Sequence, residues 1–262
     1  MKTLKTLLLV MSLAVFATLA RAQQPRLYAA IDYMHIPEDR SEQDYIALEK
    51  LWQRLHQKAT DAGICRGWYL ERVENGGRND FVTIRVYDSL DKLVNPWPDS
   101  LTKDLFTTNE MAQIRQTEQV RQLAHSELWE IEAAAVKKIQ DGGEHFALIT
   151  FMKPKPGKEQ EYYKAEKEIF RKVHQARVDA GVMNGWYFLS RMYPSGYDSP
   201  FDYITVNIYA DKAAAEKPWD MKLLEKALDK DELAKSNTFL DMRTAVRNEI
   251  WHSVLRAVPS KN

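Results

Sequence analysis

One phrase occurs twice in this chain of 262 residues: DAGICRGWYLER begins at Asp61 and DAGVMNGWYFLSR begins at Asp179. The two copies are 118 residues apart, and the separation becomes 122 after four extra residues in a turn of the second copy. With these separations the following positions match: Tyr45 and Tyr163, Ala47 and Ala165, His56 and His174, Tyr87 and Tyr209, Trp97 and Trp219, Trp129 and Trp251. Such self-similarity indicates two copies of one structural unit.

Each copy has the same predicted order of elements, β-α-β-β-α-β. The β-rich runs are 28–34, 67–73, 81–88 and 126–132 in the first copy, and 146–152, 185–192, 203–210 and 248–254 in the second. Apolar residues at helical spacing predict helices over 41–63 and 159–181. Ser41 with Asp44 resembles a capping box, and Gly63 and Gly181 suit left-handed helix ends. Further helical regions are predicted to open at Pro96-Trp97 and Pro218-Trp219.

The two third strands are the best indication of how the copies pack. In 81–88 and in 203–210, one face is apolar and the other combines aromatic with polar residues, so neither is a plain solvent face. A β-α-β-β-α-β unit has helices on only one face of its sheet, and its other face needs a cover. We therefore expect an α+β fold in which two tandem ferredoxin-like units, 23–132 and 146–262, pack sheet to sheet around a linker at 133–145. A chain that already holds both units is expected to be a monomer.

The first 22 residues have the pattern of a secretory signal peptide. A basic start precedes the apolar run TLLLVMSLAVFATLA, and Ala20, Arg21 and Ala22 form an A-x-A cleavage site. We expect the mature chain to be extracytoplasmic, periplasmic or secreted, with no integral membrane segment after cleavage. Cys65 is the only cysteine, which leaves no internal disulfide in an exported chain.

Charge argues against nucleic acid as a partner. Removing the leader takes away Lys2, Lys5 and Arg21 and no acidic residue, which leaves 34 basic against 37 acidic groups and a formal charge of −3. Binding to phosphates needs a basic excess instead.

The duplicated ferredoxin-like order, with GWY opening the second strand of each copy, resembles the dimeric α+β barrel superfamily. This superfamily includes antibiotic-biosynthesis-type monooxygenases, stress-responsive barrel proteins and, among fused chains, relatives of chlorite dismutase. The resemblance implies a ligand or haem pocket between a sheet and its own helices. The resemblance rests on the order of elements, and the sequence contains no haem-ligand motif. It therefore indicates where a site would lie but not which reaction the site performs.

One coordinated difference between the copies indicates where a polar site lies. Asp32 on the first strand corresponds to Thr150, and Arg85 on the third strand corresponds to Asn207. These strands are adjacent and antiparallel in the predicted topology, so Asp32 and Arg85 are expected to form an ion pair in the first copy alone. The candidate ligand-binding residues are Asp32, His56, Trp68, Arg85 and Tyr87, together with His174, Asn207 and Tyr209 in the second copy.

The repeated histidines and tryptophans also have structural explanations. His56 and His174 follow core positions, at the edge of the buried helical stripe, and a boundary histidine often serves packing alone. The strand tryptophans are expected in the core. Arg121 and Arg243, upstream of Glu127 and Glu249, suggest a repeated ion pair at the start of each last strand. No H-x-H, H-E-x-x-H or Cys/His cluster occurs, so no metal site is expected.

Four functions stay open at this level. The first is an exported binding protein for a small, partly aromatic molecule. The second is a cofactor-independent monooxygenase or isomerase, with His56 or a neighbouring carboxylate acting on the substrate. The third is a haem-binding barrel with a histidine axial ligand. The last is a structural or interaction module without a pocket.

Overall fold

The computed structural model describes residues 26–74, 81–95, 97–137, 145–196 and 198–260. The predicted leader therefore lies outside the described residues, as does most of the linker. Eight antiparallel strands form one closed barrel in the order β1-β3-β2-β8-β5-β7-β6-β4. The strands are β1(Leu27–His35), β2(Gly67–Val73), β3(Phe81–Tyr87), β4(Gln122–Val136), β5(Phe146–Pro154), β6(Gly185–Tyr193), β7(Tyr203–Tyr209) and β8(Arg243–Ala257).

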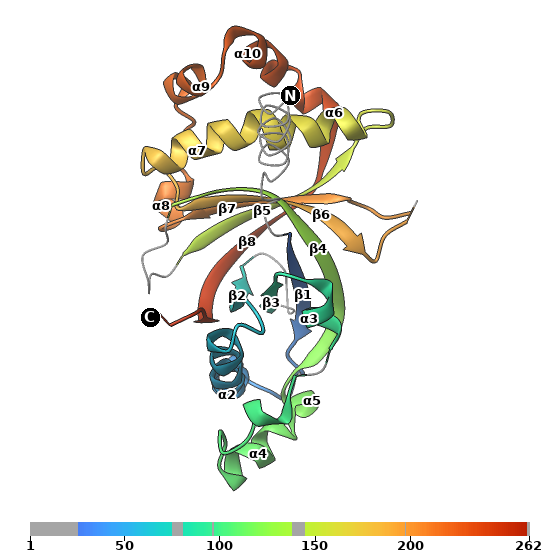
Figure 1. The fold of residues 1–262 in the computed structure, drawn as a ribbon, viewed down its shortest axis with the longest axis vertical. Coiled ribbons are helices and arrows are strands. Elements are labelled where there is room, and N and C mark those ends of the chain that lie inside the picture. Colours follow the sequence, from blue (N-terminus) through green and yellow to red (C-terminus); the bar gives the residue numbers. More distant parts are fainter. Residues whose placement is uncertain (1–25, 75–80, 96, 138–144, 197, 261–262) are drawn as a thin grey trace, which may run out of the picture.

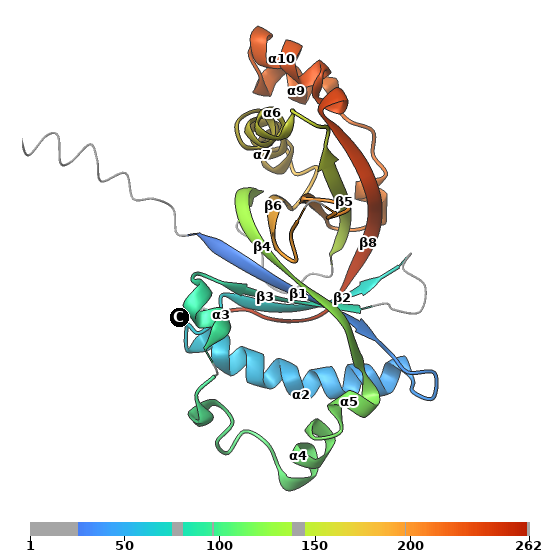
Figure 2. The same ribbon diagram turned by 90° about the vertical axis from the view of Figure 1, so that its right-hand side faces the viewer.

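Helices cover the barrel on two opposite sides (Figures 1 and 2). In the first half, residues 26–137, they are α2(Glu42–Asp61), α3(Leu90–Val94), η1(Asp99–Leu101), α4(Thr108–Ile114) and α5(Thr117–Val120). In the second half, residues 145–260, they are α6(Glu159–Lys164), η2(Ala165–Phe170), α7(Arg171–Asp179), α8(Lys212–Ala215), α9(Met221–Ala227), α10(Lys230–Asn237) and η3(Phe239–Met242). Among the described residues, no helix combines the length and apolar character needed to cross a bilayer.

The two halves share one apolar interior. The sheet of each half has the order β4-β1-β3-β2 or β8-β5-β7-β6, and β2 pairs with β8 while β4 pairs with β6. The two sheets were expected to face each other. The structure shows in addition that their edge strands are hydrogen-bonded, which closes the sheets into a barrel. Val82 and Ile84 of β3, with Ile204 and Val206 of β7, point into this interior, as the alternation predicted.

The opposite face of each sheet packs against its own helices. Phe81 lies in a cluster with Tyr45 of α2, and Tyr87 lies in another with Leu55 of the same helix. The predicted capping box of Ser41 and Asp44 is present at the start of α2, where it satisfies backbone N–H groups of the first turn. The space between α2 and the first-half sheet is therefore the place where side chains of both layers meet.

A π-helical segment changes the predicted correspondence between the two long helices. In α2, Tyr45 and Glu49 are buried one turn apart, and in the second half the equally buried pair is Tyr162 and Glu166. The ring of Tyr45 packs on Phe81, and that of Tyr162 packs on Tyr203, the counterpart of Phe81. The predicted match of Tyr45 with Tyr163 is therefore wrong by one residue. The π-helical η2 contains the extra residue, which restores the match at His56 and His174.

Two predicted boundaries also differ from the structure. The last strand of each half is longer than expected, 15 residues in both β4 and β8, because each strand bridges two sheets of the barrel. The predicted helix start at Pro218-Trp219 is wrong, since these residues lie between α8 and α9, and in the first half Pro96 is outside the described residues. Helical structure begins earlier, where Ser89 and Asp211 cap α3 and α8 with their side chains.

Candidate functional site

A cavity of about 520 Å³ lies between α2 and the sheet of the first half. We call it the inner chamber. Aromatic and aliphatic side chains form much of its wall, and a few charged groups reach into it. Its lining includes Asp32, Met34, Glu49, Trp52, Leu55, His56, Trp68, Thr83, Arg85, Tyr87, Leu93, Trp97, Glu118, Arg121 and Leu123. The structure thus brings the five first-half residues of the predicted set, Asp32, His56, Trp68, Arg85 and Tyr87, around one space.

The predicted ion pair between Asp32 and Arg85 is confirmed. Nη2 of Arg85 donates to Oδ2 of Asp32 at 2.8 Å. The two residues are diagonal neighbours, because Asp32 lies opposite Thr83 and Arg85 opposite Ala30 in the β1–β3 register. The hydroxyl of Ser126 on β4 donates to the other carboxylate oxygen of Asp32 at 2.6 Å. The carboxylate is thereby oriented from two strands.

His56 projects from α2 onto the aromatic wall of the inner chamber. Its ring stacks on Trp68, with centroids 4.8 Å apart and planes at 7°, and meets the edge of Trp97 at 4.9 Å. Burial, assisted by the positive charges of Arg85 and Arg121, lowers the pKa of His56 to about 3. The imidazole is therefore neutral at physiological pH, and its buried Nδ1 has no hydrogen-bond partner among the described residues.

The structure adds Glu49 and Arg121 to the chamber, a pair that sequence reasoning missed at this place. Oε1 of Glu49 lies 2.7 Å from Nε of Arg121, and the carboxyl is only 1% exposed. Burial raises the pKa of Glu49 to about 7, against the opposing effect of Arg121. A usable signal was present in the sequence: Glu49, Trp52 and His56 are spaced three and four residues apart and share one face of α2.

The three second-half candidates, His174, Asn207 and Tyr209, line neither this chamber nor the adjoining cavity described below. His174 stacks on Trp186 at 4.7 Å, as His56 does on Trp68. The buried guanidinium of Arg177 then occupies the space beside it, 3.2 Å from the Tyr209 hydroxyl and 4.3 Å from the ring of Trp219. Asn207 stays on β7, in register with Trp186.

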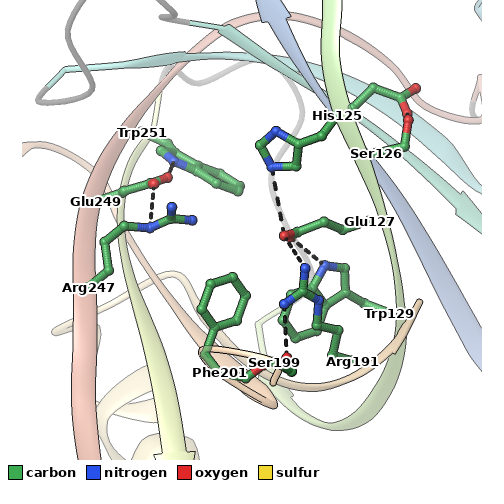
Figure 3. Close-up of polar contacts among 11 residues, drawn as sticks. His125, Ser126, Glu127, Trp129, Arg191, Ser199, Phe201, Arg247, Glu249 and Trp251 are labelled. Atoms are coloured by element: carbon green, nitrogen blue, oxygen red, sulfur yellow. Dashed lines mark hydrogen bonds and ion pairs between the residues drawn. The ribbon is translucent and has the colours of Figure 1, made fainter. Parts of the chain in front are cut away.

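A second group of charged residues lies on β4, β6 and β8, where the predicted pairing is wrong (Figure 3). Glu127 pairs with Arg191 of β6 at 2.9 Å, and Glu249 pairs with Arg247 at 2.9 Å. Each carboxylate also accepts a hydrogen bond from the tryptophan two residues later, Trp129 or Trp251. The four strand tryptophans are buried as expected, and these carboxylates satisfy the indole N–H of two of them.

A β-bulge explains why Arg121 does not reach Glu127. The register between β1 and β4 shifts between Tyr33 and Met34, which leaves one extra residue in β4. Side chains of β4 before the bulge therefore point to the opposite face from the one that simple alternation predicts. Arg121 therefore points toward α2, while Glu127 points into the barrel. The same shift between Phe151 and Met152 separates Arg243 from Glu249 in the second half.

The residues present do not fit a haem group at either repeated histidine. An axial histidine needs its second ring nitrogen held by an acceptor such as a carboxylate or a carbonyl. Within the described part of the chain, Nδ1 of His56 is buried without a partner, and Nδ1 of His174 faces the guanidinium of Arg177 at 3.4 Å.

Comparison with solved structures places this fold in a known class. The chain is similar to a "Putative monooxygenase" from Fusobacterium nucleatum with a TM-score of 0.56 and 13% identity, covering 90% of this chain and 95% of the other. A "putative monooxygenase" from Lactobacillus acidophilus gives a TM-score of 0.54 with 12% identity, covering 90% and 97%. A "Putative Chlorite dismutase" gives 0.51 with 9% identity, covering 88% and 96%.

No protein-family model matches the chain. No curated protein matches it in sequence either. The structural neighbours nevertheless resemble its fold over most of both chains. The fold is therefore an α+β barrel, as the order of elements suggested. At these identities the likeness concerns the fold alone, and the chemistry of the site has to be argued from its own residues.

Proposed function

We propose that the inner chamber binds a small, neutral, partly aromatic molecule. The observation that carries this proposal is a cavity of about 520 Å³ with three tryptophans and the Asp32–Arg85 pair in its wall. Small-molecule sites are typically clefts of about 300–1,000 Å³ with apolar walls and a few oriented polar groups. Trp52, Trp68 and Trp97 supply flat surfaces on which an aromatic ring packs.

The charges in the chamber favour a neutral ligand over an ion. Asp32 is paired with Arg85, Glu49 is paired with Arg121, and His56 is uncharged at neutral pH. An added ionic charge would meet no free counter-charge among these groups, and its desolvation would be uncompensated. A carbonyl oxygen, by contrast, can accept from Arg85, and a hydroxyl or amide hydrogen can be donated to Asp32.

Binding of a matched pair of probes tests this proposal. Isothermal titration calorimetry should show that naphthalene-2-carboxamide binds, and that naphthalene-2-carboxylate of nearly equal shape binds at least about tenfold more weakly. Trp68→Ala should weaken the carboxamide, and Leu240→Ala, an exposed apolar position in the second half, should not. Absence of binding by both probes would contradict the proposal and favour a module without a ligand.

Catalysis is a second candidate, and Glu49 is the observation that favours it. A general base works best when its pKa is close to the working pH, and the pKa of Glu49 is about 7 in the wall of the chamber. Glu49 could remove a proton from a phenol or an activated C–H group, the first step of cofactor-independent oxygenation or isomerisation. Exchange of the acidic C–H of anthrone with deuterium, followed by NMR, tests this step. Loss of catalysed exchange in Glu49→Gln is expected.

The haem alternative has a direct measurement. Because neither His56 nor His174 is arranged as an axial ligand, titration of the purified protein with haem should give no shifted Soret band. A stoichiometric Soret shift that disappears in His56→Ala would overturn this reasoning.

The origin and location of the chain belong to the same proposal. We propose that the two halves arose by duplication, that residues 1–22 are removed on export and that the mature protein is a monomer. The matched stacks of His56 on Trp68 and His174 on Trp186 support the duplication. Amino-terminal sequencing of the protein from a cell envelope fraction and light scattering of the mature form test the other two statements.

A further inference from the structure

A second cavity, which we call the outer hollow, adjoins the inner chamber. Its volume is about 460 Å³, and it shares the wall residues Asp32, Arg85 and Leu93 with the chamber. The rest of its lining is Ala30, Ser126, Glu127, Leu128, Tyr193 and Pro194. The Asp32–Arg85 pair therefore stands between two spaces, each with apolar walls of its own.

The far wall of the outer hollow comes from the second half. Tyr193 is the last residue of β6 and lies opposite Leu128 of β4, at one of the two seams that close the barrel. Its side chain is 63% exposed, one of the more exposed large apolar residues described. Tyr193 therefore offers apolar surface from the second half to the outer hollow.

The ion pair is placed to contact a ligand from both sides. Asp32 is 13% exposed and Arg85 is 32% exposed, so the pair is neither sealed in the core nor fully in solvent. Ser126, which holds the Asp32 carboxylate at 2.6 Å, is itself in the wall of the outer hollow. The polar groups of the pair are therefore part of the wall of both spaces, and each space has apolar residues of its own.

We propose that the ligand is elongated and extends through both spaces, with its aromatic end in the inner chamber, a neutral polar group at Asp32 and Arg85, and an aliphatic segment in the outer hollow. Leu128 and Tyr193 pack on the aliphatic segment, so the second half determines how long a ligand the first-half site accepts. This inference rests on the proposed function and adds the substrate class to it.

A matched pair of amides tests the length of the site. Naphthalene-2-carboxamide has the ring and the polar group alone, and N-butyl-naphthalene-2-carboxamide adds an aliphatic chain on the far side of the amide. The N-butyl compound should bind about tenfold more tightly to the wild-type protein, because its chain leaves water for the outer hollow. Tyr193→Ala should remove most of this advantage and leave the affinity for the shorter amide unchanged.

Two controls separate this inference from the proposed function. Trp68→Ala should weaken both amides by a similar factor, and Leu240→Ala should change neither. If the shorter amide binds but the N-butyl chain adds nothing, or if its advantage survives in Tyr193→Ala, the elongated ligand is wrong and the inner-chamber site stands. If neither amide binds, both proposals fall.

Discussion

The two halves of this protein build the same aromatic stack and then use the space beside it differently. His56 stacks on Trp68 at 4.8 Å in the first half, and His174 stacks on Trp186 at 4.7 Å in the second. Beyond the stack, the first half has a cavity of about 520 Å³, while in the second the buried Arg177 lies between Tyr209 and Trp219.

A few side chains account for this difference. Arg177 stands where the first half has Ala59, one turn after the histidine. Phe239 packs on Phe170 with centroids 3.9 Å apart, and its counterpart in the first half is the much smaller Thr117. One scaffold can thus present either a cavity or a filled core, depending on the volume of the residues on the helices.

The largest expected effect distinguishes the two stacked tryptophans. Trp186→Ala should lower the free energy of unfolding by about 5 kcal/mol, the upper part of the range for a fully packed Trp. Trp68→Ala should cost about 3 kcal/mol, because Trp68 already borders a cavity and less new void is created. Urea unfolding of both variants measures the difference. Equal losses would mean that the two sites are packed equally well.

The next largest effect is the pH dependence of stability that comes from one buried carboxyl in each half, Glu49 and Glu166. The pKa of Glu49 and that of Glu166 are both raised by burial to about 7. Such groups bind more protons in the folded state than in the unfolded state, so folding stability falls as pH rises from 4.5 to about 7. Glu49→Gln should remove the part of this pH-dependent loss of unfolding free energy that the Glu49 carboxyl causes. That part is up to about 3 kcal/mol relative to the wild type.

Urea unfolding at several pH values across this window gives the measurement, and Glu166→Gln is the matched variant. His56 and His174, whose pKa values are lowered, make the unfolding free energy rise with pH instead. This contribution is the same in the wild type and in each variant, so it cancels in the difference between them. A difference in unfolding free energy that is constant with pH would show that the carboxyl is ionised throughout.

A third experiment converts the second half toward the first. Arg177→Ala should cost about 2 kcal/mol of stability, because it leaves a void and takes the hydrogen bond from Tyr209. The new space should admit a second molecule of naphthalene-2-carboxamide, which doubles the stoichiometry seen by calorimetry. Arg171→Ala, an exposed arginine in the same helix, is the control. An unchanged stoichiometry would show that other side chains close the space.

The smallest effect is expected for the ion pair. The double variant Asp32→Thr with Arg85→Asn gives the first half the residues of the second. Because the pair is partly exposed, the coupling energy from a double-mutant cycle should be below about 1 kcal/mol. The same variant should nevertheless lose carboxamide binding. A large loss of stability would assign the pair to folding rather than to the ligand.

Much of this architecture could be predicted because it depends on short-range patterns. Strict alternation in 81–87 and 203–209 assigns one face of each strand to an apolar interior, and the repeat places those faces in two equivalent sheets. The pairing of Asp32 with Arg85 followed from the strand order, since adjacent antiparallel strands bring such residues within reach. The capping residues Ser41 and Asp44 act over a single turn, so they too were visible in the sequence.

Other features depend on contacts between distant segments. The bulge opposite Tyr33 and Met34 changes which face Arg121 occupies, and the π-helical η2 shifts Tyr162 by one residue. Neither has a reliable local signal, because each is stabilised by the packing that it permits. The difference between the chamber beside His56 and the Arg177 guanidinium beside His174 is of the same kind. Local patterns specify the elements and their faces, but whether a space stays empty depends on the summed volume of side chains that only the folded chain brings together.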